Sequence, residues 1–112
     1  MIKNNVKTKW KNKEVVLNSF LSIPNTFTAE IMSEQGYDAL TIDYQHGMIS
    51  FSDLFTMLQS IRSSGVTPIC RVSGLDHAVI SKVMDAGALG IICPMINNCL
   101  LYTSPSPRDP SI

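Results

Sequence analysis

Short apolar segments alternate with helix-like segments along most of this chain, and this rhythm restricts the fold more than any other feature. The apolar segments are apolar on both faces, as is typical of strands that are buried on both sides. We expect four strands, at Val15–Leu21, Ala39–Asp43, Thr67–Val72 and Ala88–Cys93. Strands and helices in alternation predict an α/β fold with a parallel sheet, in which right-handed crossovers join successive strands.

Three helices are expected between these strands. Ser50 and Asp53 have the S-x-x-D spacing of a capping box, and apolar residues then recur on one helical face. Each of the three helices has a residue that can cap its start and a glycine that ends it. Given from the cap to the glycine, they are Asn25 or Thr26 to Gly36, Ser50 to Gly65, and Asp76 to Gly87.

With 112 residues, the chain forms one domain at most. Nine Lys and Arg residues balance nine Asp and Glu residues, so no net charge favours nucleic acid or an acidic membrane surface. Five lysines lie within residues 1–13; a nucleic-acid-binding arm is one interpretation, and a solvated basic leader is the one we favour.

No apolar run approaches the roughly 18 residues of a membrane span. Because no signal-peptide core follows the leader, we expect a cytoplasmic protein.

The three cysteines do not indicate a metal centre. Cys70, Cys93 and Cys99 are an odd number without metal-ligand spacing, and two of them lie within expected strands. We therefore expect reduced thiols that pack in the core rather than disulfides or a zinc site. The chain also contains neither of the glycine-rich motifs that bind dinucleotides and nucleoside triphosphates.

Polar side chains follow the expected strands at their carboxyl ends, where parallel sheets bind their ligands. Asp43 and His46 follow the second strand, and Arg71 lies at the end of the third. An imidazole titrates near neutral pH, and a fixed guanidinium can stabilise a developing negative charge. These strand ends therefore predict an enzyme site rather than a simple packing domain.

Each of these residues also has a plainer interpretation. His46 can be an ordinary loop residue, and Arg71 can be the partner of a structural carboxylate, although a substrate carboxylate would also supply the anion that a buried-strand arginine needs. Asp43 can simply accept backbone N–H groups of the following turn, as carboxylates at strand ends commonly do.

Six segments in combination resemble the opening of the HpcH/HpaI family of class II pyruvate aldolases, over about residues 14–98. The segments are Ala29–Met32, Gly36–Asp38, Ile42–Gly47, Arg71–Val72, Asp85–Ala88 and Pro94–Met95. The resemblance implies the N-terminal half of a TIM (β/α)8 barrel, with about four of the eight strands and three helices. It also implies a lyase that cleaves 4-hydroxy-2-oxo acids to pyruvate and an aldehyde, and a homo-oligomer, trimeric or hexameric, when the protein is full length.

The resemblance implies roles for single residues. His46 matches the family's general base, which acts through a metal-bound water, and Arg71 matches the residue that binds the oxo acid and steadies its enolate. Phe20 would line the substrate site, and Asp43 would hold metal-bound water. The metal would be Mg²⁺ or Mn²⁺, with Co²⁺ as a further option. Because the family's carboxylate ligands lie on later strands, no metal ligand is assigned to this chain.

Asp85 matches an acid that raises the basicity of the catalytic histidine. A carboxylate in the last turn of a helix opposes the helix dipole, which costs a few tenths to about 1 kcal/mol. A helix in a βα barrel ends on the face opposite the active site, so Asp85 is expected far from His46 of its own chain. We therefore expect Asp85 to serve His46 of a neighbouring subunit; the plainer interpretation is an exposed Asp before a glycine turn.

Some features depart from the family pattern. Gln45 stands where the family often has Glu, and Met48 replaces a frequent Pro.

The βα rhythm stops at Cys99, and residues 99–112 contain three prolines in a short polar run that resembles a translated sequencing adapter. We expect this segment to be a non-native or disordered tail, and the chain to be an inactive N-terminal fragment. Two alternatives are an acyl-CoA lyase like the citrate lyase β subunit and a non-enzymatic half-barrel that serves as an interaction module.

Overall fold

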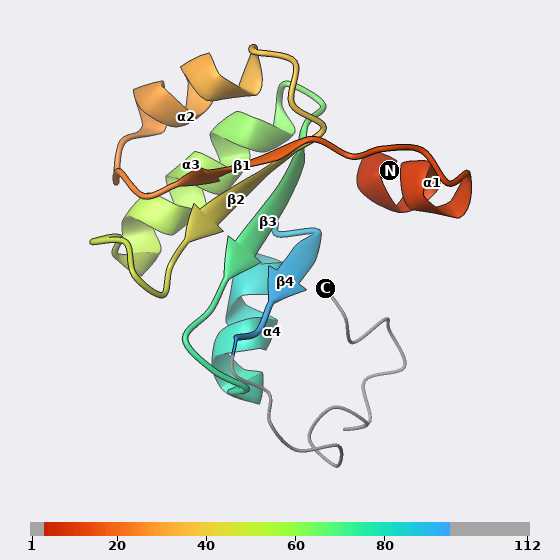
Figure 1. The fold of residues 1–112 in the computed structure, drawn as a ribbon. Helices are drawn as coiled ribbons and strands as arrows, with labels where there is room; N and C mark the ends of the chain where they lie inside the picture. Colours follow the sequence, from red (N-terminus) through yellow and green to blue (C-terminus); the bar gives the residue numbers. More distant parts are fainter. Residues whose placement is uncertain (1–3, 95–112) are drawn as a thin grey trace.

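The structure is a computed structural model that describes residues 4–94. A parallel sheet and four helices make up the fold (Figure 1). The helices are α1 (Asn5–Lys11), α2 (Thr26–Ser33), α3 (Phe51–Arg62) and α4 (His77–Asp85). The strands are β1 (Asn18–Leu21), β2 (Ala39–Asp43), β3 (Thr67–Arg71) and β4 (Gly90–Ile92). The predicted helix caps Asn25, Ser50 and Asp76 each accept a backbone N–H of the following turn.

The four strands form one sheet in the order β1-β2-β3-β4, and every neighbouring pair is parallel. Because α2, α3 and α4 each connect two neighbouring strands, the chain is a run of βαβ units. This confirms the predicted α/β fold with four parallel strands. β1 and β4 are the two edges of the sheet, and Figure 1 shows both without a further strand beside them.

Two apolar clusters cover the two faces of the sheet. Leu40, Ile42 and Cys70 point to the face that packs against the helices, where Leu54 and Leu58 of α3 are fully buried. Ala39 and Ile69 belong to the opposite face. Residues that alternate along a strand point to opposite sides, so the two clusters reflect the period of two in β2 and β3. Both faces of these central strands are therefore buried, as the apolar residues on both of their faces predicted.

The basic segment at the N-terminus is structured, contrary to the solvated leader that we expected. Asn5–Lys11 form α1, and Val6 of this helix is 2% exposed because it packs against Ala39 and Ile69. The Nζ of Lys9 donates to Asp38 Oδ1 over 2.6 Å. α1 is thus a fourth helix that covers the amino-terminal end of the sheet. The lysines share the surface of the helix, and Val6 is its single buried residue.

The edge strands are shorter than expected. β1 begins at Asn18 rather than Val15, and Val15 is 87% exposed. β4 spans Gly90–Ile92, whereas the sequence predicted Ala88–Cys93. Apolar composition alone overestimates an edge strand, because only residues with a hydrogen-bonded neighbour belong to the sheet.

Cys70 is buried and Cys93 is partly buried, and both carry free thiols as expected; Cys99 and the predicted tail at 99–112 lie outside the described residues. Within residues 4–94, no helix has the length and apolar character that a membrane crossing requires.

Candidate active site

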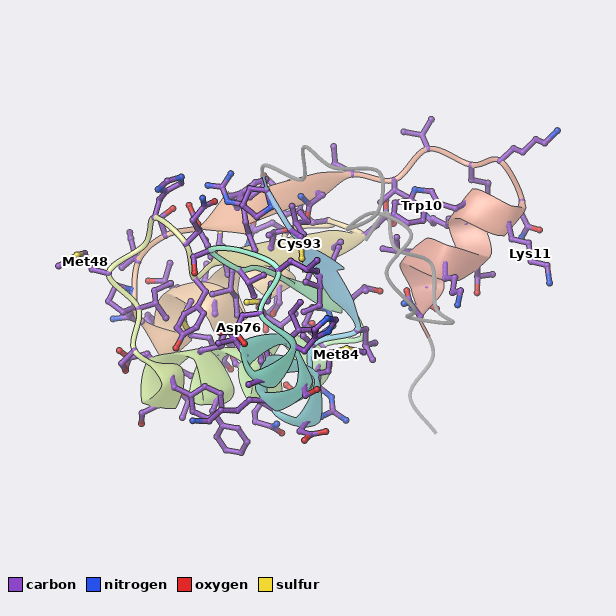
Figure 2. All side chains as sticks on the ribbon, turned by 90° about the horizontal axis from the view of Figure 1, so that it is seen from below. Trp10, Lys11, Met48, Asp76, Met84 and Cys93 are labelled. Carbon is purple, nitrogen blue, oxygen red and sulfur yellow. The ribbon has the colours of Figure 1, made fainter. Side chains whose placement is uncertain are left out.

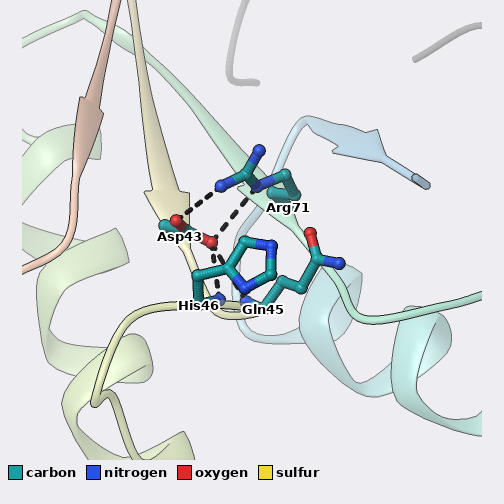
Figure 3. Close-up of polar contacts among 4 residues, drawn as sticks. All are labelled: Asp43, Gln45, His46 and Arg71. Carbon is teal, nitrogen blue, oxygen red and sulfur yellow. Dashed lines mark hydrogen bonds and ion pairs between the residues drawn. The ribbon is translucent and has the colours of Figure 1, made fainter. Parts of the chain in front are cut away.

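Asp43 and Arg71 meet at the carboxyl end of the sheet. They are the last residues of β2 and β3, and the register of these strands places them directly opposite each other. Arg71 Nη2 donates to Asp43 Oδ2 over 2.6 Å, and Arg71 Nε donates to Asp43 Oδ1 over 3.2 Å (Figure 3). This two-point contact fixes the plane of the guanidinium. The carboxyl ends of β2 and β3 therefore hold the Asp43 carboxylate and the Arg71 guanidinium in direct contact.

Asp43 also organises the loop that carries His46. Its Oδ1 accepts the backbone N–H of His46 over 2.9 Å and that of Gln45 over 3.2 Å. In Figure 3 the imidazole of His46 lies beside the Asp43–Arg71 pair, at the same end of the strands. Because the Asp43 carboxylate bonds both the Arg71 guanidinium and the His46 backbone, it fixes the positions of Arg71 and His46 relative to each other.

Gly47 completes this loop through its missing side chain. Its backbone N–H donates to the carbonyl oxygen of Asp43 over 3.0 Å, which closes the turn. A Cβ atom at Gly47 would lie 2.3 Å from that same oxygen. Such a distance is far inside van der Waals contact, so only glycine permits this close return of the chain.

Phe20 brings the end of β1 to the same rim. The Arg71 Cζ lies 4.9 Å from the centroid of the Phe20 ring, within the range of a cation–π contact. Phe20 remains 46% exposed, so the ring also faces the space above the sheet. Arg71 therefore has a carboxylate on one side and an aromatic ring on another. Its Nη1 has no hydrogen-bond partner among residues 4–94.

The electrostatics follow from this pairing. The hydrogen bond from Arg71 holds the pKa of Asp43 below its usual value, against the opposing effect of burial, and the backbone N–H of His46 adds to the lowering. The same pair raises the pKa of Arg71. Burial and the nearby Asp43 charge raise the pKa of Cys70 to about 12, so this thiol is protonated and is a packing group rather than a nucleophile.

The structure brings together most of the residues that the sequence singled out. His46, Arg71, Asp43 and Phe20 share the carboxyl rim, and their catalytic roles stay predictions. Asp43 accepts backbone N–H groups, as the plainer interpretation expected, and it supplies the anion that Arg71 needs. The sequence did not predict this Asp43–Arg71 pair. Its signal was present, since each residue ends a buried strand and the two strands are neighbours.

Asp85 lies apart from this group. It is exposed at the carboxyl end of α4, and the chain then enters the amino end of β4. Because His46 follows the carboxyl end of β2, the two residues are at opposite ends of the sheet. The structure therefore does not join Asp85 to His46 within one chain.

The described residues do not offer a metal site. No group of three or more His, Cys, Asp and Glu side chains within residues 4–94 could hold an ion. At the rim, the candidate metal ligands are the Asp43 carboxylate and the His46 imidazole. The Asp43 carboxylate already binds Arg71 and two backbone N–H groups. Gln45 Oε1 is buried beside this group without a hydrogen-bond partner, and nothing in the sequence indicated that. These donors do not fit a divalent cation by themselves.

Comparison with known proteins matches one family. The family model for HpcH/HpaI aldolase/citrate lyase matches residues 17–99. A hydroxypyruvate/pyruvate aldolase from Rhizorhabdus wittichii is 40% identical over 94 residues, which are 84% of this chain and 38% of that protein. A 4-hydroxy-2-oxo-heptane-1,7-dioate aldolase from Salmonella dublin is 31% identical over 97 residues, 87% of this chain and 37% of that protein.

Solved structures agree with the fold. A family protein from Burkholderia cenocepacia matches with a TM-score of 0.78 and 25% identity, over 98% of this chain and 47% of that one. The citrate synthase SbnG matches with a TM-score of 0.76 and 32% identity, over 81% of this chain and 37% of that one. The match with the curated relatives thus spans a little over a third of their length.

Proposed function

The chain belongs to the HpcH/HpaI aldolase/citrate lyase family, and from this membership we propose that it carries the substrate-binding half of a pyruvate aldolase. The reaction is the reversible cleavage of a 4-hydroxy-2-oxo acid to pyruvate and an aldehyde. The enzyme is a cytoplasmic homo-oligomer in its full-length form. In this proposal the 112-residue chain is inactive by itself, because it matches only a little over a third of its relatives and the rest of the barrel supplies the remaining catalytic groups.

One observation supports this proposal above all others. Asp43 bonds the Arg71 guanidinium and the backbone of His46 at the same time, so a base and a cationic anchor share one rim. Enolate chemistry needs both groups, since a proton must be removed and a negative charge must be stabilised.

In the cleavage direction, Arg71 binds the oxo-acid end of the substrate through Nη1, which has no partner among the described residues. His46, through a water, takes the proton of the 4-hydroxyl group. The bond between C3 and C4 then breaks, and the aldehyde leaves with the new carbonyl group. The electron pair of the broken bond forms the pyruvate enolate, and the Arg71 charge stabilises its oxygen. A proton returned to C3 completes pyruvate.

Phe20 and Asp43 set the position of Arg71 in this reaction. The centroid of the Phe20 ring lies 4.9 Å from the guanidinium carbon, and the ring is 46% exposed, which leaves it able to contact the oxo acid. Asp43 holds two of the guanidinium nitrogens, so the third is directed to the ligand. A divalent cation such as Mg²⁺, Mn²⁺ or Co²⁺ belongs to the proposal only for the longer protein, with ligands from outside the described residues. No step above depends on it.

Asp85 acts between subunits in this proposal. It is exposed at the opposite end of the sheet from its own His46, which leaves it open to a neighbouring chain. Its carboxylate raises the basicity of the neighbour's His46.

A chimera tests the proposed reaction. Residues 17–94 replace the matching segment of the Rhizorhabdus wittichii aldolase, and pyruvate release from a 4-hydroxy-2-oxo acid is measured. We expect activity that His46→Ala and Arg71→Ala each reduce by roughly 100-fold or more. Glu34→Ala, at an exposed position after α2, is the matched control and leaves the rate unchanged. A folded chimera without pyruvate release would contradict the proposal.

The same chimera tests Asp85. Chains with His46→Ala and chains with Asp85→Ala are inactive alone, and a mixture regains activity if the two residues act between subunits. No regained activity on mixing counts against this sharing.

A second candidate comes from the similarity to SbnG, whose structure carries the name citrate synthase. The same rim would then bind an oxo acid for carbon–carbon bond formation, or an acyl-CoA for its cleavage. Citrate production by the chimera, or a requirement for acyl-CoA, would favour this candidate over the aldolase.

A further inference from the structure

The side-chain oxygen of Gln45 lies at the candidate active site without a hydrogen bond. Gln45 stands between Asp43 and His46 in the loop after β2, and its backbone N–H donates to Asp43 Oδ1 over 3.2 Å. Its Oε1 atom is buried and has no hydrogen-bond partner among residues 4–94. In Figure 3 the Gln45 side chain lies beside the imidazole of His46, at the same end of the sheet as Arg71.

The position of this oxygen distinguishes it from the other buried polar atoms that lack a partner. Within residues 4–94 these are Arg62 Nε, Thr67 Oγ1 and Gln45 Oε1. Arg62 ends α3 and Thr67 begins β3, so both lie toward the amino end of the sheet. Gln45 lies at the carboxyl end, where parallel sheets bind their ligands. A buried acceptor without a donor costs free energy, and a ligand that brings a donor to it removes that cost. Figure 2 shows all the side chains of the described part around this end of the sheet.

Asp43, His46 and Arg71 do not supply a free acceptor for a further hydroxyl group. Asp43 Oδ1 accepts the backbone N–H groups of Gln45 and His46 and the Nε of Arg71, and its Oδ2 accepts from Arg71 Nη2. A guanidinium can only donate. His46 takes the proton of the 4-hydroxyl group in the proposed function. A second hydroxyl group of the substrate therefore has Gln45 Oε1 as its acceptor.

We propose that Gln45 Oε1 binds a hydroxyl group on C3 of the oxo acid, and that the site favours 3-hydroxy-2-oxo acids over pyruvate. Hydroxypyruvate is the smallest acid of this class. The proposal rests on the proposed function, because Arg71 must hold the oxo acid at the rim. C1 of that acid is the carboxylate and C2 carries the oxo group, so a hydroxyl group on the three-carbon fragment can only be on C3.

The Gln45 side chain can reach this hydroxyl group at little cost. Its last torsion joins an sp³ carbon to an sp² carbon and has broad minima. Because Oε1 has no hydrogen bond among the described residues, rotation of the carboxamide toward the rim breaks none at this atom. The hydroxyl group of the bound acid then supplies the donor that the oxygen lacks.

The chimera that carries residues 17–94 tests this specificity. Aldol addition of hydroxypyruvate and of pyruvate to acetaldehyde is measured, and the ratio of the two kcat/KM values reports the preference. Gln45→Met removes the acceptor at nearly the same side-chain length. We expect the ratio of hydroxypyruvate to pyruvate to fall about tenfold, which corresponds to the loss of one hydrogen bond. An unchanged ratio overturns the proposal.

Two further variants separate hydrogen bonding from shape and charge. Gln35→Met makes the same replacement at an exposed position after α2 and leaves the ratio unchanged. Gln45→Glu keeps an acceptor oxygen and adds a negative charge, which repels the carboxylates of both acids. We therefore expect both kcat/KM values to fall while their ratio stays within about threefold. A tenfold loss of the ratio in Gln45→Glu overturns the proposal, because the acceptor would then not determine the preference.

Calorimetric titration distinguishes a failure of this proposal from a failure of the proposed function. A chimera that binds both acids but forms no product contradicts the aldolase function, and the ratio of its two Kd values still decides the role of Gln45 through the same tenfold criterion. A chimera that forms product, with equal ratios in the parent and Gln45→Met, overturns only the role of Gln45. A folded chimera that binds neither acid overturns both.

Discussion

Asp43 and Arg71 stand opposite each other at the last paired position of β2 and β3, and their carboxylate and guanidinium groups form a two-point ion pair. Asp43 is 7% exposed and Arg71 is 27% exposed at the side chain. The pair is thus partly buried. The Asp43 contact fixes the geometry of the guanidinium, and part of the guanidinium is still exposed at the rim. It also explains how an arginine is tolerated directly after the buried Cys70.

Removal of the Asp43 charge should weaken the fold. Asp43→Asn keeps an oxygen for the backbone N–H groups but leaves Arg71 without its anion. We expect a loss of about 2 kcal/mol in the free energy of unfolding, measured by urea denaturation. Asp85→Asn is the matched control at an exposed position, and its effect should stay within about 0.5 kcal/mol. An equal effect of both substitutions would show that the Asp43–Arg71 pair does not support the fold.

Stability should fall in acid because of the same residue. The folded protein lowers the pKa of Asp43, and likewise that of Asp38, whose carboxylate accepts from Lys9 and from the backbone of Leu17. Their stabilising effect is therefore present above the unfolded pKa of about 3.9 and is lost as the pH falls through the lower folded value. Denaturation midpoints between about pH 7 and about pH 3 measure this loss. The decline should be smaller in Asp43→Asn, and an unchanged decline would contradict the assignment.

Gly47 and Gly74 provide a pair of alanine substitutions with opposite expectations. A Cβ at Gly47 would lie 2.3 Å from the Asp43 carbonyl oxygen, whereas a Cβ at Gly74 has nothing within 4 Å. Gly47→Ala should cost about 2 kcal/mol or more and displace the His46 loop. Gly74→Ala should be neutral or stabilise by up to about 1 kcal/mol, because it restricts the unfolded chain. Thermal unfolding measures both, and a harmless Gly47→Ala would show that the turn relaxes freely.

The role of α1 can be measured through its single buried side chain. Val6→Ala removes two methyl groups from the contact with Ala39 and Ile69, and we expect a cost of about 1–2 kcal/mol. Val15→Ala is the control, since Val15 is 87% exposed, and it should change stability by less than about 0.5 kcal/mol. Equal values for the two would indicate that α1 does not contribute to folding.

The 112-residue chain should release no measurable pyruvate from 4-hydroxy-2-oxo acids, even with added Mg²⁺ or Mn²⁺. Residues 4–94 bring His46 and Arg71 together, but in the proposed function the rest of the barrel supplies the remaining catalytic groups. A coupled assay that consumes pyruvate measures this directly, with the Rhizorhabdus wittichii aldolase as the positive control. Robust release by the single chain would contradict the expectation.

Much of the fold could be predicted because its signals are local. The caps Asn25, Ser50 and Asp76 act within one turn of their own helices, and the apolar runs of β2 and β3 need no partner to be recognised. The N-terminal helix could not be predicted in this way. A lysine-rich segment resembles a solvated leader until Val6 finds a site against Ala39 and Ile69, which are distant in sequence.

The sequence by itself determined the order of strands and helices, the parallel arrangement, and the placement of His46 and Arg71 at strand ends, because these follow from periodicity and from the connection rules of βαβ units. Only the tertiary structure decided that Asp43 is the anion of Arg71 and that Phe20 lies against the same guanidinium. The physical reason is that strand register and side-chain direction join residues separated by tens of positions, and no local pattern records such a distance.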